Sequence, residues 1–224
     1  MYLARGTVIA RLLVVAALVA APLIVCAYDD GDFQIWNTNV QEFKINDLTK
    51  GALEEEFRWA DDADEFYYHH YDAGFSRVMN DFFSLGGGYR HIFELKRGEF
   101  KAENEPYMTA ILSGEIAGCA IEDRSRFEYR QFDYQDDSKR YRNKITVKLP
   151  WSFTRAKIQP FLSDEGFMSI ADEALFAQNR LSAGCGAALN DRIKLEAYYM
   201  LQSSKGSSVW TDTHVFGTKI KIVF

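Results

Sequence analysis

The feature that most constrains this chain is an alternation of charged and apolar side chains that recurs in several segments. In the stretch Glu122–Arg130, charges occupy every second position, and the positions between them end in Phe127 and Tyr129. Successive side chains of a β-strand point to opposite faces, so this stretch has one charged face and one largely apolar face. The segments 139–149, 192–202 and 211–224 alternate in the same way. Such strands fit a soluble sandwich, or a membrane barrel whose charged face lines a lumen.

Strand length distinguishes these two alternatives. We predict eleven strands, at 33–43, 49–60, 65–76, 82–94, 101–113, 119–132, 139–149, 156–168, 175–188, 192–202 and 211–224. Strands of soluble proteins usually have five or six residues, whereas tilted strands that cross a bilayer need about nine to eleven. The sequence therefore predicts an all-β fold, an antiparallel transmembrane β-barrel of about 10–12 strands. Because single-chain bacterial barrels have even strand numbers, we expect that the first segment lies outside the barrel wall or that one strand is split or missed.

The predicted connections alternate in length. "SRVMND", "SGEIAG" and "LNDR" are short, whereas "ELKRGEFKAE", "DYQDDSKR", "SIADEAL" and "SSKGSSVW" are longer and more polar. Outer-membrane barrels have short turns on the periplasmic side and longer loops outside. The connections therefore favour the membrane barrel.

The N-terminus predicts export. Arg5 and Arg11 precede a short apolar run that ends in Val25-Cys26-Ala27, which is typical of a secretory signal peptide. We expect residues 1–27 to be a signal peptide and 28–224 an outer-membrane β-barrel of a Gram-negative bacterium. Cleavage would leave 24 basic and 32 acidic residues, a net charge of −8, which disfavours nucleic acid as a partner.

Partners follow from this location. We expect outer-membrane lipid and lipopolysaccharide around the barrel, and recognition by the outer-membrane assembly machinery through the last strand, which ends at Phe224. Cys119 and Cys185 remain after cleavage, and we expect both to be unpaired because their predicted strands are three spacings apart. All four tryptophans fall near predicted strand ends, as in interfacial girdles: Trp36, Trp59, Trp151 and Trp210.

The mature chain resembles a family of bacterial outer-membrane β-barrels known only as a domain of unknown function, of the DUF2490 type. The resemblance rests on "DFQIWNT", "LEEEFRW", "FYYHHYDAGF", "LGGGYRHIF", "DRSRFEYR", "RYRNKITVKLP", "QNRLSAG" and "YYMLQSSK", in that order. It departs at Glu105, where the family pattern implies a basic residue before the proline. The resemblance implies a fold and a location but no activity.

The alternation also predicts which charges face the lumen. The early strands give an acidic wall, made of Glu54, Glu56, Asp72, Glu94, Glu103 and Glu105. The middle strands give a basic wall, made of Arg124, Arg126, Arg130, Arg140, Arg142, Lys144 and Lys148. We expect the two walls to face each other. They fit a packed lumen whose charges pair, since buried charges need compensation, or a narrow water-filled pore with a transverse field.

Catalysis has less support in the sequence. His69 and His91 share the outward face and His70 the inward one, but a lipid hydrolase of this kind needs a serine beside a histidine. Ser76 and Ser84 fall at the other end of the predicted hairpin. The glycines of "LGGGYR" lack the helix and Lys-Ser/Thr pair of a phosphate loop and indicate close backbone approach instead. We therefore predict no catalytic residue, metal ligand or cofactor.

The leading functional hypothesis from the sequence is a narrow solute pore. The first alternative is a closed barrel with a structural or surface-interaction role, and the second is an outer-leaflet lipid hydrolase.

Overall fold

The computed structural model describes residues 30–151, 157–170, 174–206 and 209–224. The predicted signal peptide lies outside these residues. Eleven strands are present: β1 (Asp32–Asn46), β2 (Thr49–Ala60), β3 (Glu65–Asn80), β4 (Phe83–Lys96), β5 (Glu99–Ile116), β6 (Cys119–Phe132), β7 (Ser138–Lys148), β8 (Gln159–Ile170), β9 (Ala174–Ala188), β10 (Ile193–Lys205) and β11 (Trp210–Val223). In the described ranges no helix is long and apolar enough to cross a membrane.

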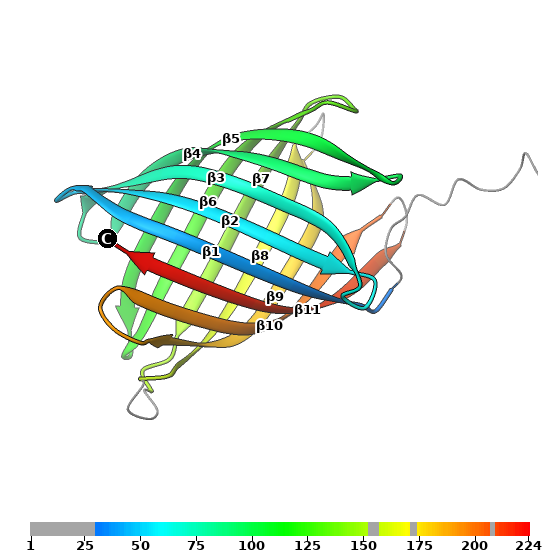
Figure 1. The fold of residues 1–224 in the computed structure, drawn as a ribbon. Coiled ribbons are helices and arrows are strands. Elements are labelled where there is room, and N and C mark those ends of the chain that lie inside the picture. Colours follow the sequence, from blue (N-terminus) through cyan, green and yellow to red (C-terminus); the bar gives the residue numbers. More distant parts are fainter. Residues whose placement is uncertain (1–29, 152–156, 171–173, 207–208) are drawn as a thin grey trace, which may run out of the picture.

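The strands form one closed barrel in which each strand pairs with its sequence neighbours, and β1 pairs with β11 (Figure 1). Every consecutive pair is antiparallel, but β1 and β11 are parallel, from Asp32 beside Thr213 to Glu42 beside Val223. An odd number of alternating strands can close only with one parallel pair. The expectation of an even count is therefore wrong, because the first strand is a full member of the wall. We call the barrel end where β1 begins the N-terminal end, and the end where β11 finishes the C-terminal end.

Two connections show why the predicted alternation in loop length does not hold. "ELKRGEFKAE", expected to be a long loop, is almost entirely strand, and β4 and β5 are joined by Arg97 and Gly98 alone. Ala117 and Gly118 join β5 to β6 in the same manner at the other barrel end. All four residues have positive φ, between 52° and 82°, as a type I′ turn requires. Tight turns therefore occur at both ends of the barrel.

The two faces of the wall differ as the alternation predicts. Outward positions carry exposed Leu, Ile, Phe and Met, including Leu53, Phe75, Met108 and Leu181. Outward polar side chains are fewer and bond to each other: Asn39 donates to Glu55 at 3.3 Å, and Asn179 donates to Asp164 at 2.8 Å. The barrel thus has an apolar band outside and most of its charge inside, the reverse of a soluble barrel.

Glycines in the wall make room for inward aromatic rings. A Cβ at Gly88 or Gly74 would collide with the hydroxyl of Tyr107, and one at Gly217 would collide with the Tyr198 ring. The close approach predicted for "LGGGYR" is confirmed at Gly88. Cys119 on β6 and Cys185 on β9 are both free, as expected from their separation.

Candidate functional site in the barrel lumen

The lumen holds a cavity of about 590 Å³ whose lining is rich in charge. Eleven basic side chains line it: Arg58, Arg90, Lys96, Arg124, Arg130, Arg140, Arg142, Lys144, Arg180, Lys205 and Lys219. Six acidic side chains line it: Glu54, Glu56, Glu94, Glu103, Glu165 and Glu196. The lining is therefore cationic, although the whole chain has a formal net charge of −6.

The residues predicted from the sequence fall in three places. Most of them line the cavity, as the two lists above show. Asp72, Glu105 and Arg126 are buried but are not part of the cavity lining. Lys148 is exposed at the C-terminal end of the barrel, where β7 finishes.

The acidic and basic walls meet along one side of the barrel. The acidic residues come from β2 to β5 and the basic ones from β6 and β7, and β5 pairs directly with β6. At this junction Arg130 donates two hydrogen bonds to Glu103, at 2.5 and 2.9 Å. Opposite charges therefore pair along this boundary, whereas β2 lies across the closed barrel from β7.

Beyond this junction the pairs join into one chain of ions. Arg140 donates to Glu105 at 2.7 Å and also to Glu128. Arg142 donates to the other oxygen of Glu128 at 2.9 Å and to Glu165 at 2.8 Å. Glu105 and Glu128 are completely buried. Such charge-assisted bonds are the strong class of hydrogen bond, and here they tie the consecutive strands β5, β6, β7 and β8 together on the lumen face.

The network continues through two further arginines. Arg90 donates to Asp72 at 3.0 Å and lies 3.5 Å from Glu105. Arg124 donates to Glu165 at 2.9 Å. Glu105 therefore serves Arg90 and Arg140 together, which gives a structural role to the position where the sequence departs from the family pattern.

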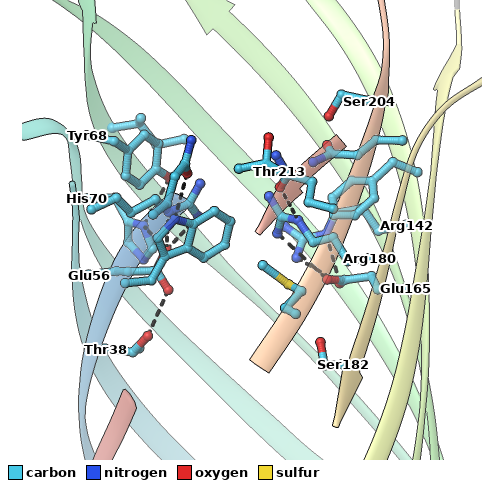
Figure 2. A pocket seen from close by; sticks show the side chains of 18 of the residues that line it. Thr38, Glu56, Tyr68, His70, Arg142, Glu165, Arg180, Ser182, Ser204 and Thr213 are labelled. Atoms are coloured by element: carbon cyan, nitrogen blue, oxygen red, sulfur yellow. Dashed lines mark hydrogen bonds and ion pairs between the residues drawn. The ribbon is translucent and has the colours of Figure 1, made fainter. Parts of the chain in front are cut away.

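Aromatic rings also line the lumen, and arginines stack on them. The Arg58 guanidinium lies 3.6 Å from the centre of the Trp36 ring and 3.9 Å from that of Tyr68. Arg180 lies 4.8 Å from Trp36 and 4.7 Å from Phe167. Figure 2 shows Tyr68, His70 and Glu56 on one side of the cavity, and Arg142, Arg180 and Glu165 on the other. The prediction that Trp36 belongs to an interfacial girdle is wrong, because this ring is only 2% exposed and points inward.

Three cations of the lumen, Lys144, Lys205 and Arg126, have no acid within ion-pair distance in the described part of the chain. The backbone of Lys144 lies beside Arg124 on one neighbouring strand and Glu165 on the other. Its ammonium makes no ion pair in the described residues, since Glu165 pairs with Arg124 and Arg142 instead. Arg126 is 8% exposed, and its Nε and Nη1 atoms have no hydrogen-bond partner. Buried charges of this kind are costly unless something compensates them.

At the N-terminal end of the barrel, two carboxylates of the cavity lining, Glu94 and Glu103, lie near the connection between β6 and β7. Tyr134, in the connection between β6 and β7, lies close enough to Glu94 and Glu103 to feel their charge. Burial, reinforced by these two carboxylates, raises the pKa of Tyr134 to about 12.

Eight charged residues of the cavity lining were in neither predicted wall: Arg58, Arg90, Lys96, Glu165, Arg180, Glu196, Lys205 and Lys219. Glu165 could have been found, because Phe161, Ser163, Glu165 and Phe167 alternate inward along β8. Arg180 was harder to find, because a register shift opposite Phe167 and Met168 interrupts the alternation in β9.

The histidines form no hydrolytic site in the described residues. His91 hydrogen-bonds to Asn104 at 2.7 Å, and His69 stacks on Phe93 with ring centres 4.8 Å apart. The only hydrogen bonds of His70 in these residues are with Tyr68 and Glu54, inside the lumen. A Ser–His pair is therefore not assembled there, and no group of three or more His, Cys, Asp or Glu in these ranges could hold a metal ion.

Comparison with known proteins supports the barrel but adds no activity. The profile of a family described as "Protein of unknown function (DUF2490)" matches residues 33–213. The fold is similar to the crystal structure of the β domain of the Bordetella autotransporter BrkA, with a TM-score of 0.52 and 11% identity over 79% of this chain and 82% of that one. No curated protein matches the sequence. At this identity the similarity concerns the fold alone.

Proposed function

Because the chain belongs to the DUF2490 family and folds as a closed barrel with an apolar exterior, we propose that it is an integral outer-membrane protein whose lumen passes small anionic solutes. The observation that carries this proposal is the lining of the cavity, in which eleven basic side chains outnumber six acidic ones. Fixed charges along a pore set its ion selectivity. A cationic lining concentrates anions and repels cations.

The ion pairs reduce this surplus but do not remove it. Behind the lining lie Asp72, Glu105 and Glu128 and one more base, Arg126. Counting this second layer still leaves more basic than acidic side chains. Lys144 and Lys205 make no ion pair in the described residues, and Arg180 approaches Glu165 only to 3.9 Å. These three residues are therefore the ones we expect to meet a passing anion.

The dimensions set the class of solute. A cavity of about 590 Å³ falls within the range of small-molecule sites. Small carboxylates and phosphate esters fit this space and this charge. We also propose that lipid and lipopolysaccharide surround the barrel in the outer membrane. The outer-membrane assembly machinery would recognise the last strand, which ends at Phe224.

Planar-bilayer recording of the purified barrel tests the proposal. Wild-type protein should conduct and, in a potassium chloride gradient, give a reversal potential on the anion side. Lys144→Glu reverses a charge at the cavity and should shift the reversal potential toward cations. Lys139→Glu makes the same change on the same strand at an exposed outward position and should leave it unchanged. Equal shifts in both variants would mean that the selectivity does not arise in the lumen.

A closed barrel is the second candidate, and one observation favours it. The chain of ions from Glu105 to Glu165 joins four consecutive strands through buried carboxylates, which is an arrangement for holding neighbouring strands together. Wild-type protein that is folded and inserted but never conducts would reject the pore and support this role.

A further inference from the structure

A buried arginine without a partner lies beside the cavity, toward the C-terminal end of the barrel. Arg126 stands on β6, two residues from Glu128, with Thr109 of β5 and Arg142 of β7 as register partners. Its guanidinium lies 3.9 Å from the centre of the Tyr107 ring, which covers Gly88 and Gly74. The side chain is thus held flat between a ring and its neighbours, and does not extend into open solvent.

The charges around Arg126 have the wrong sign to compensate it. The ions that act on it most strongly are Arg124, Arg90 and Arg142. Arg126 has no carboxylate within 4.0 Å in the described residues. By contrast, a carboxylate lies within 3.0 Å of each of five other lumen arginines: Arg90, Arg124, Arg130, Arg140 and Arg142. Its Nε and Nη1 atoms are buried without a hydrogen-bond acceptor.

The nearby carboxylates are already engaged. Glu128 accepts from Arg140 and Arg142, Asp72 accepts from Arg90 and from the Tyr107 hydroxyl at 2.7 Å, and Glu165 accepts from Arg124 and Arg142. A largely buried guanidinium whose Nε and Nη1 atoms have no acceptor, with three neighbouring cations, needs an anion. Its planar donor fork matches the oxygens of a carboxylate or phosphate.

We propose that Arg126 binds an oxyanion through its guanidinium. Arg124 and Arg142 are the flanking cations of this site, and the Tyr107 ring orients the guanidinium by stacking on it. The ligand is a phosphate or carboxylate group held on the C-terminal side of Glu128. This inference does not need the lumen to conduct, because Arg126 is not part of the cavity lining.

Equilibrium unfolding of the refolded barrel tests the site, with inorganic phosphate as the probe and chloride at equal ionic strength as the reference. Wild-type protein should unfold at a higher guanidinium concentration in phosphate. Arg126→Met removes the uncompensated charge and keeps an apolar side chain against Tyr107. In chloride it should therefore be at least as stable as the wild type, and its response to phosphate should be lost. Arg126→Lys keeps the charge but loses the fork, and should bind phosphate at least tenfold more weakly than the wild type by isothermal titration.

Arg130→Met is the matched control on the same strand. Arg130 is paired with Glu103, so its loss should destabilise the barrel in chloride while the phosphate response persists. A wild type that does not respond to phosphate, or an Arg126→Met variant that still responds, would overturn the site. A phosphate response in a barrel that never conducts would leave the site standing and reject the pore, so the two proposals fail separately.

Discussion

The strongest test of the lumen network is Glu128→Gln, because this change removes one charge and almost no volume. Glu128 is completely buried and accepts from Arg140 and Arg142 through different oxygens. Removing one partner of a buried ion pair generally costs about 3–5 kcal/mol, since the other charge stays buried and uncompensated. Here Arg140 keeps Glu105 at 2.7 Å and Arg142 keeps Glu165 at 2.8 Å. We therefore expect the lower limit, a loss of about 3 kcal/mol in the free energy of unfolding.

Guanidinium unfolding of the barrel in lipid vesicles gives this number, with tryptophan fluorescence as the signal because Trp36 is buried in the lumen. Glu99→Gln is the control, since Glu99 pairs with Lys101 at the barrel rim at 2.7 Å and is largely exposed. Exposed pairs contribute little to stability, so no measurable change is expected there. If Glu128→Gln were as stable as the wild type, the lumen would be wet enough to solvate Arg140 and Arg142, and the network would not hold the walls together.

Two further predictions concern the wall. Gly217→Ala should destabilise the barrel by about 1–3 kcal/mol, as overpacking usually does, because the new Cβ collides with the Tyr198 ring. Gly114→Ala should be neutral, since nothing lies within 4 Å of a Cβ at that position, and thermal unfolding compares the two variants. The second prediction is a disulfide across β1 and β11 in a chain whose native cysteines are replaced by serine. Asn39→Cys with Ile220→Cys should form it, because these register partners lie about 4.8 Å apart, within the limit of about 7 Å between Cα atoms for such a bond. Asn39→Cys with Leu195→Cys spans two strand spacings and should not crosslink on a non-reducing gel. A crosslink in this second pair, with none in the first, would show that β1 does not pair with β11.

The alternation of side chains predicted the faces of the wall because it depends only on local backbone geometry. Each strand carries its own period of two, so Glu128 and Arg142 could be assigned to the lumen without knowing their neighbours. Their partners could not be assigned, because ion pairs depend on register and strand tilt. Arg140 and Glu105 are 35 residues apart and lie on strands separated by β6. No spacing in the sequence encodes that meeting.

Errors in the prediction trace to particular local features. The stretch around Arg97 and Gly98 is polar throughout, and polarity alone does not distinguish a long loop from two strand ends joined by a tight turn. Trp36 was assigned to the membrane interface because it falls near the start of the predicted strand 33–43, and closeness to a strand end does not say which face the side chain takes. Once β1 is a member, Trp36 pairs with Arg58 across β1 and β2 and takes the inward face.

The odd strand number has a consequence for the two ends of the chain. With eleven alternating strands, β1 begins at one end of the barrel and β11 finishes at the other, so the described chain ends on the side opposite to where it starts (Figure 1). The closing seam is a parallel ladder, which is slightly less stable per residue than an antiparallel one. It is reinforced at the C-terminal end by the Phe224 amide, which donates to the Glu42 carbonyl at 2.9 Å, and by Lys221 with the Glu42 carboxylate at 2.6 Å. Phe224 is therefore part of the seam that closes the barrel, and its backbone bond extends the parallel ladder by one residue beyond the Glu42–Val223 register pair.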